Sequence, residues 1–92
     1  MIYYEYDEEK NQTNIQKHKI SFEEAITIFQ DPYLKIASDD NSSEERFLAI
    51  GRSNKNRELL VVHCYRIKKD QEIIRIISAR KLTLRERHEF EK

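Results

Sequence analysis

The chain of 92 residues contains one cysteine, one proline and one glycine. A lone thiol, Cys64, forms neither an internal disulfide framework nor a thiolate metal cluster, which is typical of a protein in a reducing cytoplasm. No apolar run approaches the roughly 18 residues that span a bilayer. The first seven residues are too acidic and polar for a signal peptide. We therefore expect a cytoplasmic protein without a membrane partner.

The motifs of several common enzyme classes are also missing. The sequence has no phosphate-binding loop, no glycine pattern for dinucleotides, no Cys or His pair at zinc spacing and no Gly-x-Ser-x-Gly. These absences argue against hydride transfer, zinc chemistry and serine hydrolase chemistry. We accordingly expect no metal and no cofactor.

What the chain does contain is charge, which makes up 37% of its residues against 38% hydrophobic ones. Such a composition predicts one small domain, residues 1–92, whose limited core would benefit from a partner. The net charge of zero hides a segregation: residues 1–45 sum to −7 and residues 46–92 to +7. This asymmetry predicts a basic surface for an anion or for an acidic partner.

Periodicity and capping signals predict an α+β domain. Ser21 and Glu24 form a capping box, apolar residues then recur at helical spacing, and Asp31-Pro32 ends the helix. Four consecutive strands with short loops imply an antiparallel sheet with the helices on one face. The predicted strands are 2–6, 34–38, 46–51, 58–67 and 72–80, and the predicted helices are 7–18, 21–31 and from 83 to the C-terminus.

The predicted first helix is almost entirely polar, so no wide apolar stripe can hold it. Lys10, Asn14, Lys17 and His18 are spaced so that they share one of its faces. The stripe is either a solvated surface or a surface that faces phosphate. In the second interpretation His18 is a group that can move protons near neutral pH.

Arginines at strand ends are the other candidates. The apolar strand 72–80 ends in Arg80 and Lys81, just before a second capping box, and a rigid strand end is a good place to hold phosphate. Arg46 opens another strand, and Arg52 follows Gly51 at the end of that strand. A half-buried arginine must find an anion, and the sequence leaves open whether that anion is a protein carboxylate or a ligand.

Several segments also occur together in a recognisable order, with KH-x-x-SFEEA and RIISAR as the most specific pieces. They are Tyr6-Asp7, Lys10, Asn14, Lys17-His18, Ser21-Phe22-Glu23-Glu24-Ala25, Phe29, Asp31-Pro32, Glu45-Arg46, Ile50-Gly51, Leu60-Val61-Val62, Arg75-Ile76-Ile77-Ser78-Ala79-Arg80-Lys81 and Glu86-Arg87. In these segments, from Tyr6 to about Phe90, the chain resembles the BrnT toxins of bacterial type II toxin–antitoxin systems.

The resemblance implies a RelE-like fold, with an N-terminal strand and two helices, then a mostly antiparallel sheet and a C-terminal helix. It also implies a ribonuclease that inhibits translation and is neutralised by a BrnA-like antitoxin with a ribbon-helix-helix domain. The complex would repress its own operon, and only the antitoxin would touch DNA.

Two positions depart from the family pattern. Tyr6 stands where the family commonly has tryptophan, and Lys19 where it commonly has glycine. Glycine ends a helix in the left-handed region at little cost, whereas lysine there costs about 1 kcal/mol. The turn after His18 is therefore where the geometry is expected to differ.

The mechanism predicted for such a toxin is metal-independent RNA cleavage, in which a ribose 2′-OH attacks the adjacent phosphate. Arginine suits the task of charge neutralisation because it stays protonated and offers a planar fork to phosphate oxygens. We expect Arg80 and Arg46 to clamp the transition state in one pocket, with Lys17 in support and His18 as acid–base group. The expected RNA contacts are Lys10, Asn14, Arg52 and Lys81.

Two other functions remain compatible with the residues. The domain could be a non-catalytic basic module that docks an acidic protein or the ribosome. Direct DNA recognition is disfavoured because the sequence shows no helix-turn-helix and no basic recognition helix.

Overall fold

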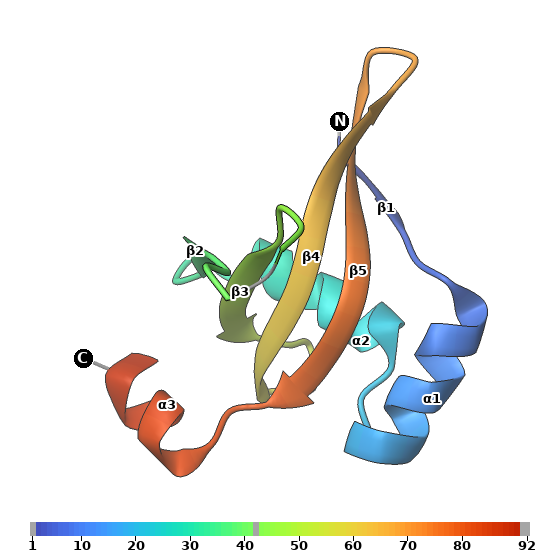
Figure 1. The fold of residues 1–92 in the computed structure, drawn as a ribbon. Helices are drawn as coiled ribbons and strands as arrows, with labels where there is room; N and C mark the ends of the chain where they lie inside the picture. The colour runs from blue at the N-terminus through green and yellow to red at the C-terminus, as the bar shows by residue number, and fades with distance from the viewer. Residues whose placement is uncertain (1, 42, 91–92) are drawn as a thin grey trace.

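The computed structural model describes residues 2–41 and 43–90, and these residues form a five-stranded sheet and three α-helices (Figure 1). In chain order the elements are β1 (Ile2–Glu5), α1 (Glu8–His18), α2 (Phe22–Thr27), a 3₁₀ turn (Ile28–Gln30), β2 (Lys35–Ser38), β3 (Phe47–Arg52), β4 (Glu58–Lys68), β5 (Gln71–Lys81) and α3 (Leu84–Phe90). The predicted α+β class and element order are confirmed. Position 42 of the loop before β3 and residues 91–92 of the predicted last helix lie outside the described residues.

The sheet is mixed, with the strand order β1-β5-β4-β3-β2. Strands β2 to β5 pair antiparallel with their sequence neighbours, as predicted. Strand β1 instead pairs parallel with β5, with Tyr3 opposite Ile73. A tight turn cannot join two strands that pair in parallel. In this chain β1 and β5 are separated by α1, α2 and the other three strands.

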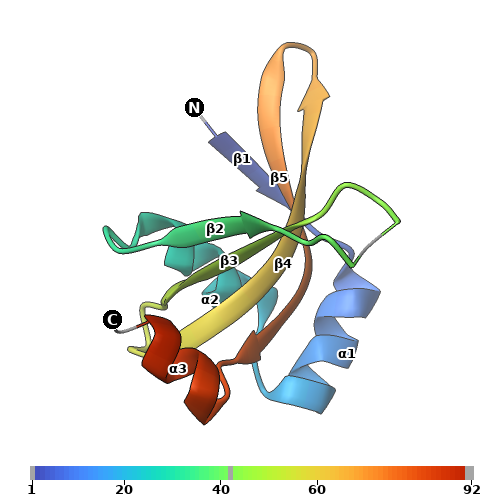
Figure 2. The same ribbon diagram turned by 60° about the vertical axis from the view of Figure 1, so that its left-hand side comes forward.

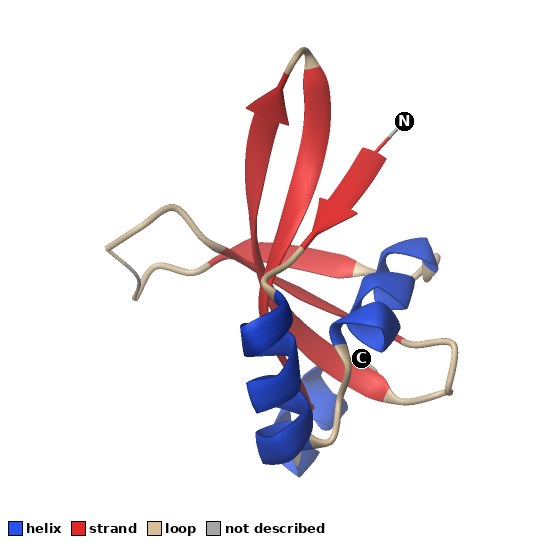
Figure 3. Cartoon of the chain, turned by 90° about the vertical axis from the view of Figure 1, so that its right-hand side faces the viewer, coloured by secondary structure: helices blue, strands red, loops and turns tan. Residues whose placement is uncertain are grey.

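The helices cover both faces of the sheet, which corrects the prediction that they share one. Figures 2 and 3 show α1 and α2 on one face, here called the helix-covered face, and α3 against the other, here called the open face. Side chains alternate along a strand, so Ala49, Val61 and Ala79 are buried on the helix-covered face. Leu60 and Arg80, whose Cα atoms are paired across β4 and β5, belong to the open face. None of the helices in the described ranges is long and apolar enough to cross a membrane.

Gly51 lets the 3₁₀ turn lie directly on β3. A Cβ at this position would stand 3.1 Å from both the Cβ and the carbonyl oxygen of Ile28 and 3.3 Å from Leu34. A backbone oxygen cannot move aside as a flexible side chain can, so a side chain at this position would push the turn outward by a few tenths of an ångström. The consequence is that Asp31, at the end of the turn, lies beside Arg52, the residue after Gly51.

Two buried asparagines hold α1 in place where an apolar stripe is missing. The Oδ1 atom of Asn11 accepts a hydrogen bond from the backbone N–H of Phe22. Asn14 is 5% exposed, donates to the carbonyls of Ile20 and Ala79 at 2.9 Å each and accepts from the N–H of Ala79 at 3.1 Å. Asn14 therefore links α1 to β5 by hydrogen bonds. The prediction that its side chain contacts RNA on an exposed surface is corrected, because the side chain is buried.

The C-terminal end of α1 has ordinary capping geometry despite its lysine. Lys19 adopts the left-handed conformation with φ of 61°, and its N–H donates to the carbonyl of Ile15 at 2.9 Å. The turn after His18 thus keeps the conformation that glycine would favour, and Lys19 carries the strain.

Replacing Lys19 with glycine is expected to stabilise the domain by about 1 kcal/mol, because the left-handed strain disappears while the backbone hydrogen bonds stay. For a domain of this size the melting temperature would rise by about 4–8 °C. The matched control is Lys17→Gly, two residues earlier in the last turn of α1, which should lower the melting temperature because glycine is unfavourable at a helical position. An unchanged or lower melting temperature for Lys19→Gly would contradict the assignment.

Candidate functional site

A cationic pocket lies at the end of the sheet, where β3, β4, β5 and α3 meet. Its volume is about 320 Å³, and we call it the Glu58 pocket. The strand register creates it, since Arg52 at the end of β3 lies opposite Glu58 at the start of β4. The residues that line it are Arg52, Asn56, Arg57, Glu58, Lys81 and Arg87.

Glu58 is the centre of this pocket. Its side chain is 7% exposed, and its Oε1 atom lies 3.3 Å from Nε of Arg87 and 3.8 Å from Nη2 of Arg52. Within the described part of the chain, its buried Oε2 atom has no hydrogen-bond partner. The pocket therefore holds a carboxylate that aligns two guanidinium groups and keeps one acceptor atom unused.

Arg57 lines the same pocket but is committed elsewhere. Its guanidinium makes two hydrogen bonds to the buried Glu24, which also accepts from the hydroxyl of Ser53 at 2.6 Å. Burial raises the pKa of the Glu24 carboxyl, but the bonds from Arg57 and Ser53 outweigh it and lower that pKa overall. This ion pair ties α2 to the β3–β4 loop and leaves Arg52, Lys81 and Arg87 as the cations for a ligand.

Arg80 lies next to the pocket and is paired with Glu86 in α3. The two Nη atoms donate to the two carboxylate oxygens at 2.8 and 2.9 Å. The predicted capping box is also present, because Thr83 N–H donates to Glu86 and the N–H of Glu86 donates to the hydroxyl of Thr83. Glu86 thus fixes the start of α3 to the end of β5, which places Arg87 over Glu58.

The hydrogen bonds from Arg80 and from the backbone of Thr83 lower the pKa of Glu86 to about 2, against an ordinary value of 4.5. A carboxylate with a depressed pKa contributes stability above its unfolded pKa and loses it as the pH falls toward the folded one. We expect the melting temperature of the wild type to fall between about pH 4.5 and 2 by more than that of Glu86→Gln. Parallel curves over that range would show that Glu86 does not anchor α3. Other carboxylates titrate in both proteins and cancel in the comparison.

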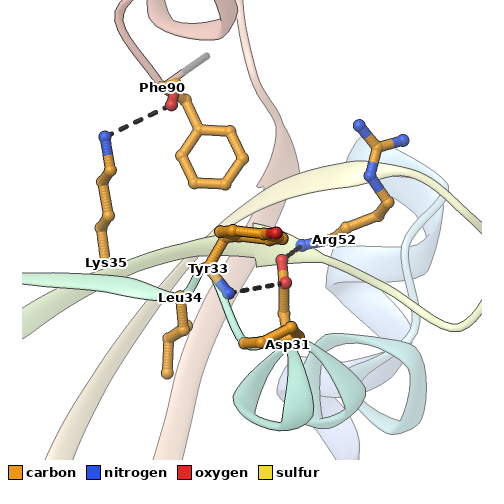
Figure 4. A pocket seen from close by; sticks show the side chains of 7 residues that line it. Asp31, Tyr33, Leu34, Lys35, Arg52 and Phe90 are labelled. Atoms are coloured by element: carbon orange, nitrogen blue, oxygen red, sulfur yellow. Dashed lines mark hydrogen bonds between the residues drawn. The ribbon is translucent and has the colours of Figure 1, made fainter. Parts of the chain in front are cut away.

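A second pocket, with a volume of about 830 Å³, adjoins the first through Arg52, which lines both (Figure 4). We call it the Tyr33 pocket. Its lining comes from the turn before β2, from the end of β3 and from the end of α3. The residues that line it are Asp31, Pro32, Tyr33, Leu34, Lys35, Arg52 and Phe90.

The structure does not bring Arg46 and Arg80 into one pocket. Arg80 lies opposite Leu60, which lies opposite Ile50 of β3, and Arg46 precedes Ile50 by four residues. At about 3.3 Å per residue the two arginines are roughly 13 Å apart along the sheet and two strands apart across it. Arg46 instead contacts Glu44 at 3.2 Å and lines a pocket of the acidic loop before β3.

Lys10, Lys17 and His18 do not line the Glu58 pocket, although Arg57 of that pocket donates to the carbonyl of Lys19, just after α1. Lys10, Lys17 and His18 are exposed on a helix that packs against the helix-covered face. Of the residues expected to act on RNA, Arg52, Lys81 and Arg80 are the ones that the structure gathers in or beside one pocket.

Glu58, Arg87 and Tyr33 were missed as candidates from the sequence. In the sequence, Glu58 looks like an ordinary polar residue at the start of a strand. Arg87 looks like one of several charged residues on a short helix. The signals that pointed to this region were the excess of positive charge after residue 45, the candidates Arg52 and Lys81, and the family segment Glu86-Arg87. No group of three or more His, Cys, Asp or Glu side chains that could hold a metal ion lies within residues 2–41 and 43–90.

Comparison with known proteins assigns this chain to a class. Residues 6–86 match a family model described as "Ribonuclease toxin, BrnT, of type II toxin-antitoxin system". The protein is thus a ribonuclease toxin of a type II toxin–antitoxin system, a class that acts on RNA and has an antitoxin partner. Because the match spans most of the chain, the chain belongs to the BrnT family, which confirms the resemblance seen in its motifs.

A solved structure supports the same conclusion. The crystal structure of the Brucella abortus ribonuclease toxin BrnT is 25% identical in sequence, with a TM-score of 0.63. The alignment covers 90% of this chain and 97% of that one. No curated protein sequence matches the chain.

Proposed function

We propose that this toxin cleaves RNA in the Glu58 pocket by attack of a ribose 2′-OH on the adjacent phosphate. The observation that carries the proposal is one buried carboxylate with an unused oxygen, surrounded by Arg52, Arg87 and Lys81. Such an arrangement supplies both a proton acceptor and fixed positive charge, the two requirements of this reaction.

The roles follow from the geometry. The guanidinium groups of Arg52 and Arg87 bind the phosphate oxygens, and this exchange of partners frees the Glu58 carboxylate. Glu58 then takes the proton of the 2′-OH as the new bond from the 2′-oxygen to phosphorus forms. The bond from phosphorus to the 5′-oxygen breaks, and that oxygen takes a proton from solvent. The products are a 2′,3′-cyclic phosphate and a 5′-OH.

Arg80 and Lys81 support this centre from the end of β5. Arg80 holds Glu86 and thereby α3, and Lys81 adds a charge at the rim of the pocket. Lys10, Lys17, His18 and Arg46 lie outside this centre. For them, contact with RNA remains a prediction from the sequence.

Metal independence is part of the proposal, since arginine and lysine supply the positive charge that a metal would otherwise bring. The test is an incubation of purified toxin with synthetic single-stranded RNA in EDTA, followed by analysis of the product ends. We expect cleavage with cyclic phosphate and 5′-OH ends. Loss of cleavage that Mg²⁺ restores, or products with 5′-phosphates, would overturn the mechanism. Binding without cleavage would favour the non-catalytic basic module.

Arg87 and Arg85 provide a matched pair for the site. Arg87→Ala removes a guanidinium 3.3 Å from Glu58 and should reduce the cleavage rate by about 100-fold or more. Arg85 is on the same helix but 90% exposed, and its charge pairs with Glu89. Arg85→Ala should therefore cleave RNA like the wild type. Equal losses in both variants would indicate a general effect of helix charge and not a phosphate contact.

The finer identity of the system is also proposed. We expect a BrnA-like ribbon-helix-helix antitoxin that blocks the Glu58 pocket, a complex that represses its own operon through the antitoxin, and inhibition of translation in the cytoplasm. We further expect the fold to superpose on RelE-like toxins. A neighbouring reading frame for a small ribbon-helix-helix protein that co-purifies with this chain would support the partner. Operator binding by the toxin alone would contradict it.

A further inference from the structure

The Tyr33 pocket has the features of a stacking site. Tyr33 is 78% exposed, yet it lies on a turn that the structure holds firmly. The carboxylate of Asp31 accepts from the N–H of Tyr33 at 3.0 Å and from the N–H of Arg52 at 2.7 Å. The N–H of Leu34 donates to the carbonyl of Asp31 at 3.1 Å. A large aromatic ring presented on a fixed turn loses little conformational entropy when it binds a flat ligand.

A second ring comes from the other side of the pocket. Phe90 ends the described part of α3, and its carbonyl accepts a hydrogen bond from Nζ of Lys35 at 3.3 Å. The same ammonium group lies 5.4 Å from the centre of the Phe90 ring. Figure 4 shows the Phe90 ring above the Tyr33 ring, with Lys35 on the side of Phe90 and Arg52 on the side of Tyr33. The volume of about 830 Å³ is ample for a nucleobase.

Arg52 connects this space to the proposed cleavage centre. It lines both pockets, and its side chain is the one that approaches Glu58. A nucleotide whose phosphate binds Arg52 in the Glu58 pocket therefore has the Tyr33 pocket within reach of its base or of its neighbour's base. Aromatic rings with a flanking arginine are the usual platform for the bases of single-stranded nucleic acid.

We infer that the Tyr33 pocket binds one unstacked base beside the scissile phosphate, between Tyr33 and Phe90, so that the substrate is single-stranded RNA. The inference rests on the proposed function of the Glu58 pocket, which it extends by naming the form of the substrate. A nucleobase fits the two rings better than an apolar protein side chain, because the pocket also carries the cations Lys35 and Arg52 that phosphates require. A base inside a duplex is stacked on both sides and cannot enter.

The direct test measures binding of the wild-type toxin to a short RNA in which every 2′-OH is methylated, so that no nucleophile remains. The RNA contains the fluorescent base 2-aminopurine, whose emission is quenched when it stacks on an aromatic ring. We expect binding with quenching for the single strand and much weaker binding for the same sequence in a duplex. Equal affinity for both forms would overturn the inference.

Variants assign the effect to the ring. Tyr33→Leu keeps an apolar side chain but removes the stacking surface, and should weaken binding by roughly 5- to 150-fold. Tyr33→Phe should recover most of this loss. The control is Tyr3→Leu, the same change at a half-exposed tyrosine of β1 that lines neither pocket. Similar affinities for Tyr33→Leu and the wild type would overturn the inference.

The two proposals fail in different ways. If unmodified RNA is not cleaved but quenching still depends on Tyr33, the proposed reaction is refuted and the proposed base-binding pocket is supported. If RNA is cleaved and Tyr33→Leu leaves the KM for a single strand unchanged, the proposed reaction is supported and the proposed base-binding pocket is refuted. A variant that binds RNA normally but loses affinity for the antitoxin would assign the pocket to the partner and would also overturn the inference.

Discussion

Replacing Glu58 with glutamine is expected to reduce the rate of RNA cleavage by at least about 100-fold. The amide has nearly the same volume, so the pocket stays filled, but it cannot take the proton from the 2′-OH. It also removes the negative charge that aligns Arg52 and Arg87. Because proton transfer belongs to the transition state, most of the loss should fall on kcat, with a smaller effect on KM through Arg52 and Arg87.

The control is Glu89→Gln, the same change on the exposed surface of α3, where the carboxylate pairs with Arg85. Its cleavage rate should match that of the wild type. Thermal unfolding and affinity for the methylated RNA would show that Glu58→Gln is folded and still binds its substrate. Cleavage at the wild-type rate by a folded Glu58→Gln protein would remove Glu58 from the mechanism.

Asn14→Ala is expected to cost roughly 3 kcal/mol or more in free energy of unfolding. The substitution leaves the N–H of Ala79 and the carbonyls of Ala79 and Ile20 without their partner, and each buried unpaired group costs about 1–3 kcal/mol. Water that enters the gap reduces the sum. A small domain has a total stability of only about 5–15 kcal/mol, so the loss should be evident in urea unfolding as a lower midpoint.

Gln16→Ala provides the comparison for this prediction, since Gln16 is an exposed amide on the same helix. It should leave the midpoint unchanged or raise it slightly, because alanine favours a helix. If both variants unfold at the same urea concentration, Asn14 does not brace α1 against β5. The hydrogen bonds to Ala79 also bear on function, because Ala79 immediately precedes Arg80. They fix the end of β5 beside the Glu58 pocket.

Local rules were sufficient for most of the elements. The two capping boxes at Ser21 and Thr83 begin helices as predicted. The capping signal depends on residues close together in the chain, where geometry follows from backbone rules. Simple alternation fails along β5, because the β-bulge opposite Val62 and His63 brings Ile74, Ile76 and Ala79 into one core. The parallel pairing of β1 with β5 was beyond such rules, since its partners lie about 70 residues apart.

The pairing of Arg80 shows where local inference stopped. Its place at a strand end and the capping role of Glu86 were both predicted, but their mutual ion pair was not. It forms because the chain turns at Leu82 and Thr83 and brings α3 back toward β5, so that one carboxylate serves the capping box and the arginine together.

Periodicity, capping and motif order were enough to predict the α+β class, the order of the elements and the resemblance to the BrnT family. Which charges meet depends on tertiary packing. Arg52 faces Glu58 through the register of β3 and β4, and Arg87 reaches the same carboxylate because α3 lies on the open face. Charges separated by tens of residues approach one another only when strand pairing and helix packing are known, so the site, unlike the family, could not be found from the chain alone.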